Sequence, residues 1–249
     1  MDLKDFYSND KRLRYNPASL ILSKRFKNYF ISFDDRFIEV TKSIIKIVKA
    51  SKQGDLRLLD IGVGDGVYEK LLPTPVRGRL KIYGIDISSN QLLRAKPFLK
   101  VGKVVDLNVQ KIPYKKNFFD IVLVSELLEH VFFPEKIISE ALRVLKKDGY
   151  LIITYPNSGA LQLRLSLFFW GRSPLLNYPA NQEHIRFFDK SDILTILGKV
   201  DVQSFVGLGS FLFAKWNFPI NIYTPRLMEL FGNRFLPGFA LGNLIVIQK

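Results

Sequence analysis

Two glutamates and one of the chain's two histidines lie close together in the segment SELLEH at residues 125–130. On a helix expected over residues 126–132, Glu126, Glu129 and His130 occupy positions i, i+3 and i+4 and share one face. Two carboxylates and an imidazole on one face suit a divalent metal ion, with room left for a further ligand and a substrate. The second histidine, His184, begins a loop that leads into a helix. Without a metal, His130 or His184 is the candidate general base, because an imidazole that titrates near neutrality can take a hydroxyl proton.

A second group of candidate residues surrounds a glycine-rich turn. Residues 58–66, LLDIGVGDG, run from an apolar strand into alternating glycines and then a helix, whose first N–H groups are free to bind a ligand. Asp86 and Asp106 end two later apolar runs, where Asp86 can accept hydrogen bonds from ribose hydroxyls and Asp106 can accept an adenine amino group beside the Leu107 amide. Asp60 would repel a pyrophosphate but not an amine or a sulfonium. The pattern therefore predicts a cofactor crevice at three strand ends; the alternative is a tight turn that binds no ligand.

The elements that position these residues alternate between short apolar runs and helices. Apolar runs of this kind are typical of central strands in a parallel sheet, and they lie at residues 56–61, 80–85, 103–105, 119–124 and 150–154. Helices are expected at residues 34–50, 66–72, 89–97, 126–132, 134–146 and 189–198. Two more apolar runs, at residues 200–206 and 242–248, predict a closing antiparallel hairpin.

In the motifs LLDIGVGDG, YGIDIS, VVDLN and FFDIVLVSELLEHV, the chain resembles the class I S-adenosylmethionine-dependent methyltransferases. The resemblance implies a Rossmann-like α/β fold: a doubly wound, seven-stranded sheet, mostly parallel with its last strand antiparallel, and helices on both faces. It also implies S-adenosylmethionine as cofactor, with Asp86 at its ribose and Asp106 and Leu107 at its adenine. The residues expected at the methionine part and beside it are Asp60, Gly62, Gly64, Gly66 and Ser125.

The pattern Glu-x-x-Glu-His with a later histidine is similar to two methyltransferase branches. One contains the ubiquinone-biosynthesis O-methyltransferases, and the other the small-RNA 3′-terminal ribose 2′-O-methyltransferases, whose corresponding side chains bind magnesium. This likeness implies Glu126, Glu129, His130 and His184 as ligands of a divalent metal such as magnesium. The same motif is frequent in methyltransferases for which no metal is established, so the general-base role of a histidine stays open.

Composition limits the class of protein. The 249 residues are 47% hydrophobic and 24% charged, as in soluble globular proteins, and the formal net charge is +14. The chain has no cysteine, which excludes disulfides and thiolate metal sites and agrees with the cytoplasm, and no apolar signal segment is apparent at its start. We expect an N-terminal helical segment at 1–52 and a methyltransferase domain at 53–249, with an insert at about 158–183. The insert is a substrate lid, a patch that rests on an anionic membrane, or a helix packed on the sheet edge.

Three functions follow from these patterns. The first is an O-methyltransferase, located in the cytoplasm or peripherally at a membrane, that acts on a small apolar, lipid-linked or sugar-linked hydroxyl. The second is an RNA ribose 2′-O-methyltransferase, which the positive charge favours although no separate RNA-binding module is visible. The third is a regulatory protein that binds S-adenosylmethionine without catalysis. The sequence leaves the oligomeric state open.

Overall fold

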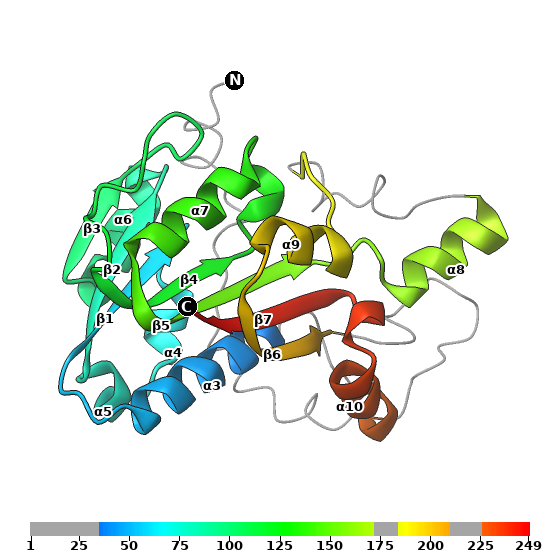
Figure 1. Ribbon diagram of the computed structural model, residues 1–249, viewed down its shortest axis with the longest axis horizontal. Helices are drawn as coiled ribbons and strands as arrows, with labels where there is room; N and C mark the ends of the chain where they lie inside the picture. Colours follow the sequence, from blue (N-terminus) through cyan, green and yellow to red (C-terminus); the bar gives the residue numbers. More distant parts are fainter. Residues whose placement is uncertain (1–34, 172–183, 210–225) are drawn as a thin grey trace.

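The apolar runs of the sequence assemble into one seven-stranded sheet with the strand order β3-β2-β1-β4-β5-β7-β6 (Figure 1). The structure is a computed structural model, and it describes residues 35–171, 184–209 and 226–249. The strands are β1 (Leu56–Ile61), β2 (Leu80–Asp86), β3 (Val101–Val104), β4 (Phe119–Ser125), β5 (Leu145–Pro156), β6 (Asp201–Leu208) and β7 (Gly242–Gln248).

The pairing of the strands confirms the predicted fold class. Strands β3, β2, β1, β4 and β5 are paired in parallel, whereas β7 is antiparallel to both of its neighbours, β5 and β6. The chain order reverses between β1 and β4, which both lie in the middle of the sheet. In open α/β sheets the crevice at such a reversal, at the carboxyl ends of the strands, is the usual place for a ligand. The glycine turn after β1 and the SELLEH segment after β4 both lie there.

Helices cover both faces of the sheet, and Figure 1 shows α3 on one side and α7 with α9 on the other. On the first face Val40, Ile44 and Val48 of α3 are buried in one cluster with residues of β1, β4, β5 and β7, which accounts for the apolar stripe seen in the sequence. On the second face, apolar residues of α7 and α9 are buried in one cluster with residues of β1, β2, β4, β5 and β7. The helices and 3₁₀ turns are α3 (Asp35–Ala50), α4 (Val67–Leu71), α5 (Thr74–Arg77), α6 (Ser89–Ala95), η2 (Lys96–Phe98), η3 (Leu128–His130), α7 (Pro134–Val144), α8 (Leu161–Trp170), α9 (Lys190–Leu197), α10 (Arg226–Phe235) and η5 (Pro237–Phe239).

Several boundaries differ from those expected. β5 begins at Leu145 rather than Tyr150, because Leu145 already pairs with Phe119 of β4, and α7 accordingly ends at Val144. β3 is Val101–Val104 rather than residues 103–105. Residues 126–132 do not form the expected helix; only the short 3₁₀ turn η3 is present there. Strands β6 and β7 pair as predicted, but α10 and η5 lie between them in the chain, so they are not a tight hairpin.

The expected insert at 158–183 is described in part. Its first section contains α8, which Figure 1 shows projecting away from the sheet, and residues 172–183 lie outside the described residues. Residues 1–34 and 210–225 also lie outside them. Within the described ranges, no helix combines the length and the apolar composition that a bilayer-crossing segment requires.

Candidate active site

The turn after β1 has a backbone that only glycine adopts without strain. Gly62, Gly64 and Gly66 have φ of +78°, +56° and +78°, in the left-handed region. A Cβ on Gly62 would meet the Leu127 side chain at 3.2 Å, and one on Gly66 would meet the Ala95 backbone at 3.2 Å. A Cβ on Gly64 would meet nothing within 4 Å, so open space lies in front of this glycine. The middle of the turn is therefore accessible to a ligand, and its two sides are packed.

Asp86, at the end of β2, holds the glycine turn in place. Its Oδ2 accepts a hydrogen bond from the Gly64 N–H at 2.9 Å, and its Oδ1 accepts one from the Ser88 N–H at 2.8 Å. Burial raises the pKa of Asp86, and the hydrogen bonds from Ser88 and Gly64 act in the opposite direction. Each carboxylate oxygen keeps a second lone pair, so the predicted acceptance of ribose hydroxyls is compatible with this geometry.

Asp60 lies beneath the turn and is paired with an acid that the sequence analysis did not single out. The Asp60 and Glu69 side chains are hydrogen-bonded to each other, and both residues are buried, each with 1% of its surface exposed. Asp60 Oδ2 and Glu69 Oε2 have no hydrogen-bond partner in the described part of the chain. Burial raises the pKa of Asp60 well above its usual range and that of Glu69 to about 7. The two carboxyl groups therefore share a proton near neutral pH.

A Glu69→Gln variant is expected to lose part of the pH dependence of stability. The pKa of Glu69 is 4.5 in the unfolded chain and about 7 in the folded protein. Its contribution to the free energy of unfolding is therefore fully present below pH 4.5 and is lost as the pH rises through 7. At pH 8 the variant should be more stable than the parent by about 1–3 kcal/mol, and at pH 4 the difference should vanish. Urea denaturation of the variant and the parent at both pH values measures this difference in the free energy of unfolding.

Glu140→Gln is the matched control for this experiment. The Arg143 guanidinium lowers the pKa of Glu140, so ionised Glu140 stabilises the folded protein at neutral pH. Glu140→Gln should therefore be less stable than the parent at pH 8, the opposite of the change expected for Glu69→Gln. A Glu69→Gln protein that is less stable than the parent at pH 8 would contradict a protonated pair at this position.

The Asp106 segment forms a short turn after β3. Asp106 Oδ1 accepts a hydrogen bond from the Asn108 N–H at 2.9 Å, and its carbonyl accepts one from the Gln110 N–H at 2.8 Å. Leu107 is partly buried against the core on the α7 side. Asn108 Oδ1 accepts a hydrogen bond from the Phe132 N–H at 3.0 Å, which ties this turn to the segment after β4. The predicted adenine contacts of Asp106 and Leu107 are thus placed beside the SELLEH segment.

The SELLEH segment departs from the expected helix at Glu126, whose φ is +49°. This left-handed residue breaks the expected helix directly after β4. Its Oε1 accepts a hydrogen bond from Thr154 Oγ1 at 2.9 Å, and its Oε2 pairs with Arg36 Nη1 at 2.8 Å. Among the described residues, the group whose atoms can reach one ion is Glu129, His130 and His184, without Glu126. Glu126 lies outside this group, so its part as a fourth metal ligand stays a prediction.

A chain of hydroxyl groups continues from Glu126 to the helix that follows the glycine turn. Thr154 Oγ1 is 2.7 Å from Ser125 Oγ, which is 2.5 Å from the Tyr68 hydroxyl. Ser125 remains a predicted cofactor contact, and its hydroxyl is already engaged in this chain. Three further residues of this site were not predicted from sequence, because each comes from a different element and none belongs to a local motif: Arg36 of α3, Tyr68 of α4 and Thr154 of β5.

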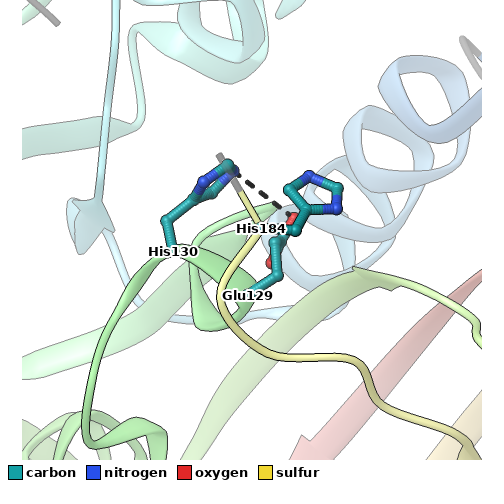
Figure 2. A group of neighbouring side chains, drawn as sticks. All are labelled: Glu129, His130 and His184. Carbon is teal, nitrogen blue, oxygen red and sulfur yellow. Dashed lines mark ion pairs between the residues drawn. The ribbon is translucent and has the colours of Figure 1, made fainter. Parts of the chain in front are cut away.

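Glu129 and both histidines meet at the start of the segment after β4, as Figure 2 shows. One ligand atom from each of Glu129, His130 and His184 lies within 4.8 Å of the other two. The His130 and His184 rings pack edge to face, with their centroids 4.8 Å apart. His130 Nε2 is 3.9 Å from Glu129 Oε1. Glu129 is buried, and neither of its carboxylate oxygens has a hydrogen-bond partner among the described residues. The structure thus unites two histidines that are far apart in sequence around a carboxyl group.

Burial sets the protonation of this cluster. It raises the pKa of Glu129 well above its usual range, an effect that the nearby Glu126 charge reinforces. It lowers the pKa of His184. Burial therefore favours the protonated form of the Glu129 carboxyl and the neutral form of the His184 imidazole, which is able to accept a proton.

Backbone contacts hold His184 in this place. The N–H groups of Ile185 and Arg186 both donate to the carbonyl of Glu129, at 2.9 and 3.2 Å. Phe188, further along the same loop, forms a β-bridge with Asn157 at the end of β5. The loop is therefore fixed at both ends to the carboxyl edge of the sheet. The cluster is also joined to the cofactor crevice, since Leu127 packs on Gly62.

Comparison with known proteins identifies this arrangement. The family described as a methyltransferase domain matches residues 59–153, which contain the glycine turn, Asp86, Asp106 and the segment after β4. Residues 59–153 are therefore a methyltransferase domain, in agreement with the resemblance to the class I S-adenosylmethionine-dependent methyltransferases. The predicted family and enzyme class are confirmed.

Relatives of this methyltransferase match over part of their length. An uncharacterised protein of Methanocaldococcus jannaschii is 33% identical over 163 residues, 64% of this chain and 63% of that protein. The ubiquinone/menaquinone biosynthesis C-methyltransferase UbiE of Campylobacter jejuni is 28% identical over 130 residues, 51% and 55%. The mitochondrial ubiquinone biosynthesis O-methyltransferase of Candida albicans is 34% identical over 113 residues, 41% and 33%. The chain therefore spans less than two thirds of the length of these relatives.

Solved structures support the fold over nearly the whole methyltransferase. The crystal structure of an S-adenosylmethionine-dependent methyltransferase from Aquifex aeolicus matches with a TM-score of 0.52 and 18% identity. The match covers 94% of this chain and 99% of that one. At this identity the likeness concerns the fold.

The residues of this methyltransferase fit S-adenosylmethionine, the cofactor of its family. The open space in front of Gly64 admits a ligand against the backbone, and Asp86 is directed to the same turn. The charged residues that the sequence pattern places at this crevice are Asp60, Asp86 and Asp106, all of them acids. Their charge suits a cofactor with a sulfonium and an amine better than one with a pyrophosphate. The structure places Asp60 against Glu69, beneath the turn, so its contact with the methionine part stays a prediction.

Proposed function

We propose that this chain transfers the methyl group of S-adenosylmethionine to the oxygen of a hydroxyl on a small apolar, lipid-linked or sugar-linked acceptor. One observation carries the proposal: both imidazoles of the chain and a buried carboxyl group gather beside the glycine turn at the carboxyl edge of the sheet. The relatives named for quinone biosynthesis include a C- and an O-methyltransferase, so the acceptor atom is part of the proposal.

The chemistry that the protein must supply is limited. When bound, S-adenosylmethionine supplies a methyl group already activated by the sulfonium. The chain must hold the acceptor oxygen in line with the carbon–sulfur bond and remove its proton. His184 is suited to proton removal, because the hydroxyl proton can pass to one of its imidazole nitrogens as the oxygen–carbon bond forms. His130 and Glu129 restrict the orientation of that ring, because they pack beside it.

Exposed apolar side chains beside the cluster support an apolar acceptor. Phe132 and Phe133 follow η3, and Ile185 and Phe187 follow His184 in its loop; each is between 42% and 49% exposed. The two segments are tied together by a hydrogen bond from Arg186 Nη2 to the Phe132 carbonyl at 3.0 Å. Binding an acceptor with an apolar ring or chain would remove these surfaces from water.

The alternative to a histidine base is a divalent cation with three protein ligands, Glu129, His130 and His184; His184 would then hold the cation and would not take the proton. The fit rests on the buried Glu129 carboxyl, whose two oxygens lack partners among the described residues, and on the two imidazoles beside it. A bound cation would make a hydroxyl more acidic. Titration of Mn²⁺ into the protein, followed by calorimetry, should show one site that Glu129→Gln removes. Absence of that site, together with full activity in a chelator, would leave His184 as the base.

The acceptor class is tested with labelled S-adenosylmethionine and fractionated cell extract. Label that enters lipid or glycan supports the proposal, and the NMR chemical shift of the transferred methyl group in the product distinguishes an O-methyl from a C-methyl group. Label that enters RNA would replace the proposal by ribose 2′-O-methylation, and retention on RNA should then fall with salt. Cofactor binding without transfer into any fraction would indicate the regulatory protein instead.

A further inference from the structure

The carboxyl end of α8 exposes a group of large apolar side chains. Phe168 is 81% exposed, Phe169 64% and Trp170 50%, and Leu167 before them is also exposed. The aromatic rings are in edge contact with one another, with Phe168 and Phe169 at 5.1 Å and Phe169 and Trp170 at 5.6 Å. Figure 1 shows that α8 projects away from the sheet. Large apolar patches of this kind on a protein surface mark sites of interaction.

The burial pattern of α8 is the reverse of that in an ordinary core helix. The residues that α8 buries are polar, Gln162 and Ser166, whereas its final aromatic residues face outward. A helix whose apolar side is meant for the protein core would bury the aromatic side chains and expose the polar ones. The apolar end of α8 is therefore arranged to meet something outside the described core.

The charge around α8 suits an anionic surface. No Asp or Glu occurs in the sequence between Asp148 and Glu183, and the whole chain has 37 Lys and Arg against 23 Asp and Glu. Arg164, exposed on α8, is held by a hydrogen bond from its Nε to the Gly159 carbonyl at 2.7 Å. The Arg164 guanidinium also acts electrostatically on Asp189. The attraction to an anionic lipid surface therefore comes from the basic excess of the whole chain, while the aromatic rings of α8 insert into the interface.

We infer that the carboxyl end of α8, residues 167–170, docks this enzyme on an anionic lipid bilayer. The helix starts at the same edge of the sheet as the acceptor cluster, since Asn157, shortly before α8, bridges to Phe188 of the His184 loop. Docking at α8 would bring that edge near the bilayer, where a lipid-linked acceptor lies. This last step rests on the proposed function; docking itself does not, because it is measured without turnover.

The test is binding of the full chain to vesicles. Vesicles of phosphatidylcholine with an equal amount of phosphatidylglycerol should retain the protein in a flotation assay, and vesicles of phosphatidylcholine alone should retain much less. The double variant Phe168→Ser with Phe169→Ser should bind the anionic vesicles at least about tenfold more weakly, because two rings no longer enter the interface. Added salt should weaken binding of the parent protein.

Leu93→Ser is the matched control, because Leu93 is 66% exposed on α6, a helix at the opposite side of the sheet from β6 and β7. This variant should bind like the parent. Equal binding by the α8 variant and the parent, or no binding by the parent, would overturn the inference. A dimer that depends on Phe168 and Phe169, without vesicle binding, would overturn it as well and assign the patch to a second copy of the chain.

Trp170 supplies a second readout that does not depend on flotation. The chain has two tryptophans, so a Trp216→Phe background leaves the fluorescence of Trp170 alone. On addition of the anionic vesicles its emission should move to shorter wavelength, as an indole ring does when it leaves water. Unchanged emission in a protein that floats with the vesicles would mean that another surface docks.

Discussion

Replacement of His184 by alanine is expected to lower kcat by about 10²- to 10⁴-fold, the contribution of a positioned general base. The ring faces His130 at 4.8 Å, and the Ile185 and Arg186 N–H groups fix its loop on the Glu129 carbonyl. The variant keeps these backbone bonds, so its affinity for S-adenosylmethionine should not change. Steady-state kinetics with labelled S-adenosylmethionine and the extract fraction that takes up label, and calorimetry with the cofactor, measure the two quantities.

Imidazole added to the solution serves as the control for this loss. Because the alanine variant leaves a space of the size of the ring, free imidazole should restore part of kcat if the missing function is proton removal. A His130→Asn variant separates the two rings: a smaller loss of kcat is expected, since His130 orients His184. Full activity of His184→Ala would remove His184 from the mechanism. Equal losses for both variants without rescue by imidazole would favour the three-ligand cation site instead.

The sheet and the glycine turn were predictable from sequence for a physical reason. Central parallel strands are buried on both faces, so their sequences are short runs of residues that are apolar throughout. Such runs gave β1, β2 and β4 nearly to the residue. The Gly62 to Gly66 turn was equally clear, because left-handed backbone leaves glycine as the residue of choice. Local patterns sufficed wherever the structure depends on local rules.

The acceptor side was predicted less well, because it depends on contacts between distant segments. The spacing of Glu126, Glu129 and His130 is helical, yet Glu126 has a left-handed backbone, and its carboxylate is taken by Arg36 from α3. Nothing in the local sequence indicates that partner. Glu69 was missed as well, although a signal existed: it lies within α4 between Tyr68 and Leu72, two large apolar residues that are both buried. A carboxyl beside such a stripe is a candidate for burial.

An Asp86→Ala variant should weaken binding of S-adenosylmethionine by about 10²-fold, as expected when two hydrogen bonds from ribose hydroxyls to a carboxylate are lost. The same carboxylate accepts the Gly64 and Ser88 N–H groups, so the variant also releases the glycine turn. Both effects act in the same direction. Calorimetry with S-adenosylhomocysteine gives the total loss, since this product shares the ribose and adenine of the cofactor.

An analogue of S-adenosylhomocysteine without ribose hydroxyls separates the two effects of Asp86. The parent protein should bind the analogue more weakly than the natural compound, whereas Asp86→Ala should bind both alike, because the side chain that distinguishes them is gone. An equal loss for both ligands would mean that Asp86 acts through the Gly64 N–H alone. Asp86→Asn is the conservative comparison: its amide keeps one acceptor oxygen but sets an N–H₂ group against the N–H of Gly64 or Ser88. It should therefore recover little of the affinity, because this position requires two acceptor oxygens to hold the turn and the ribose together.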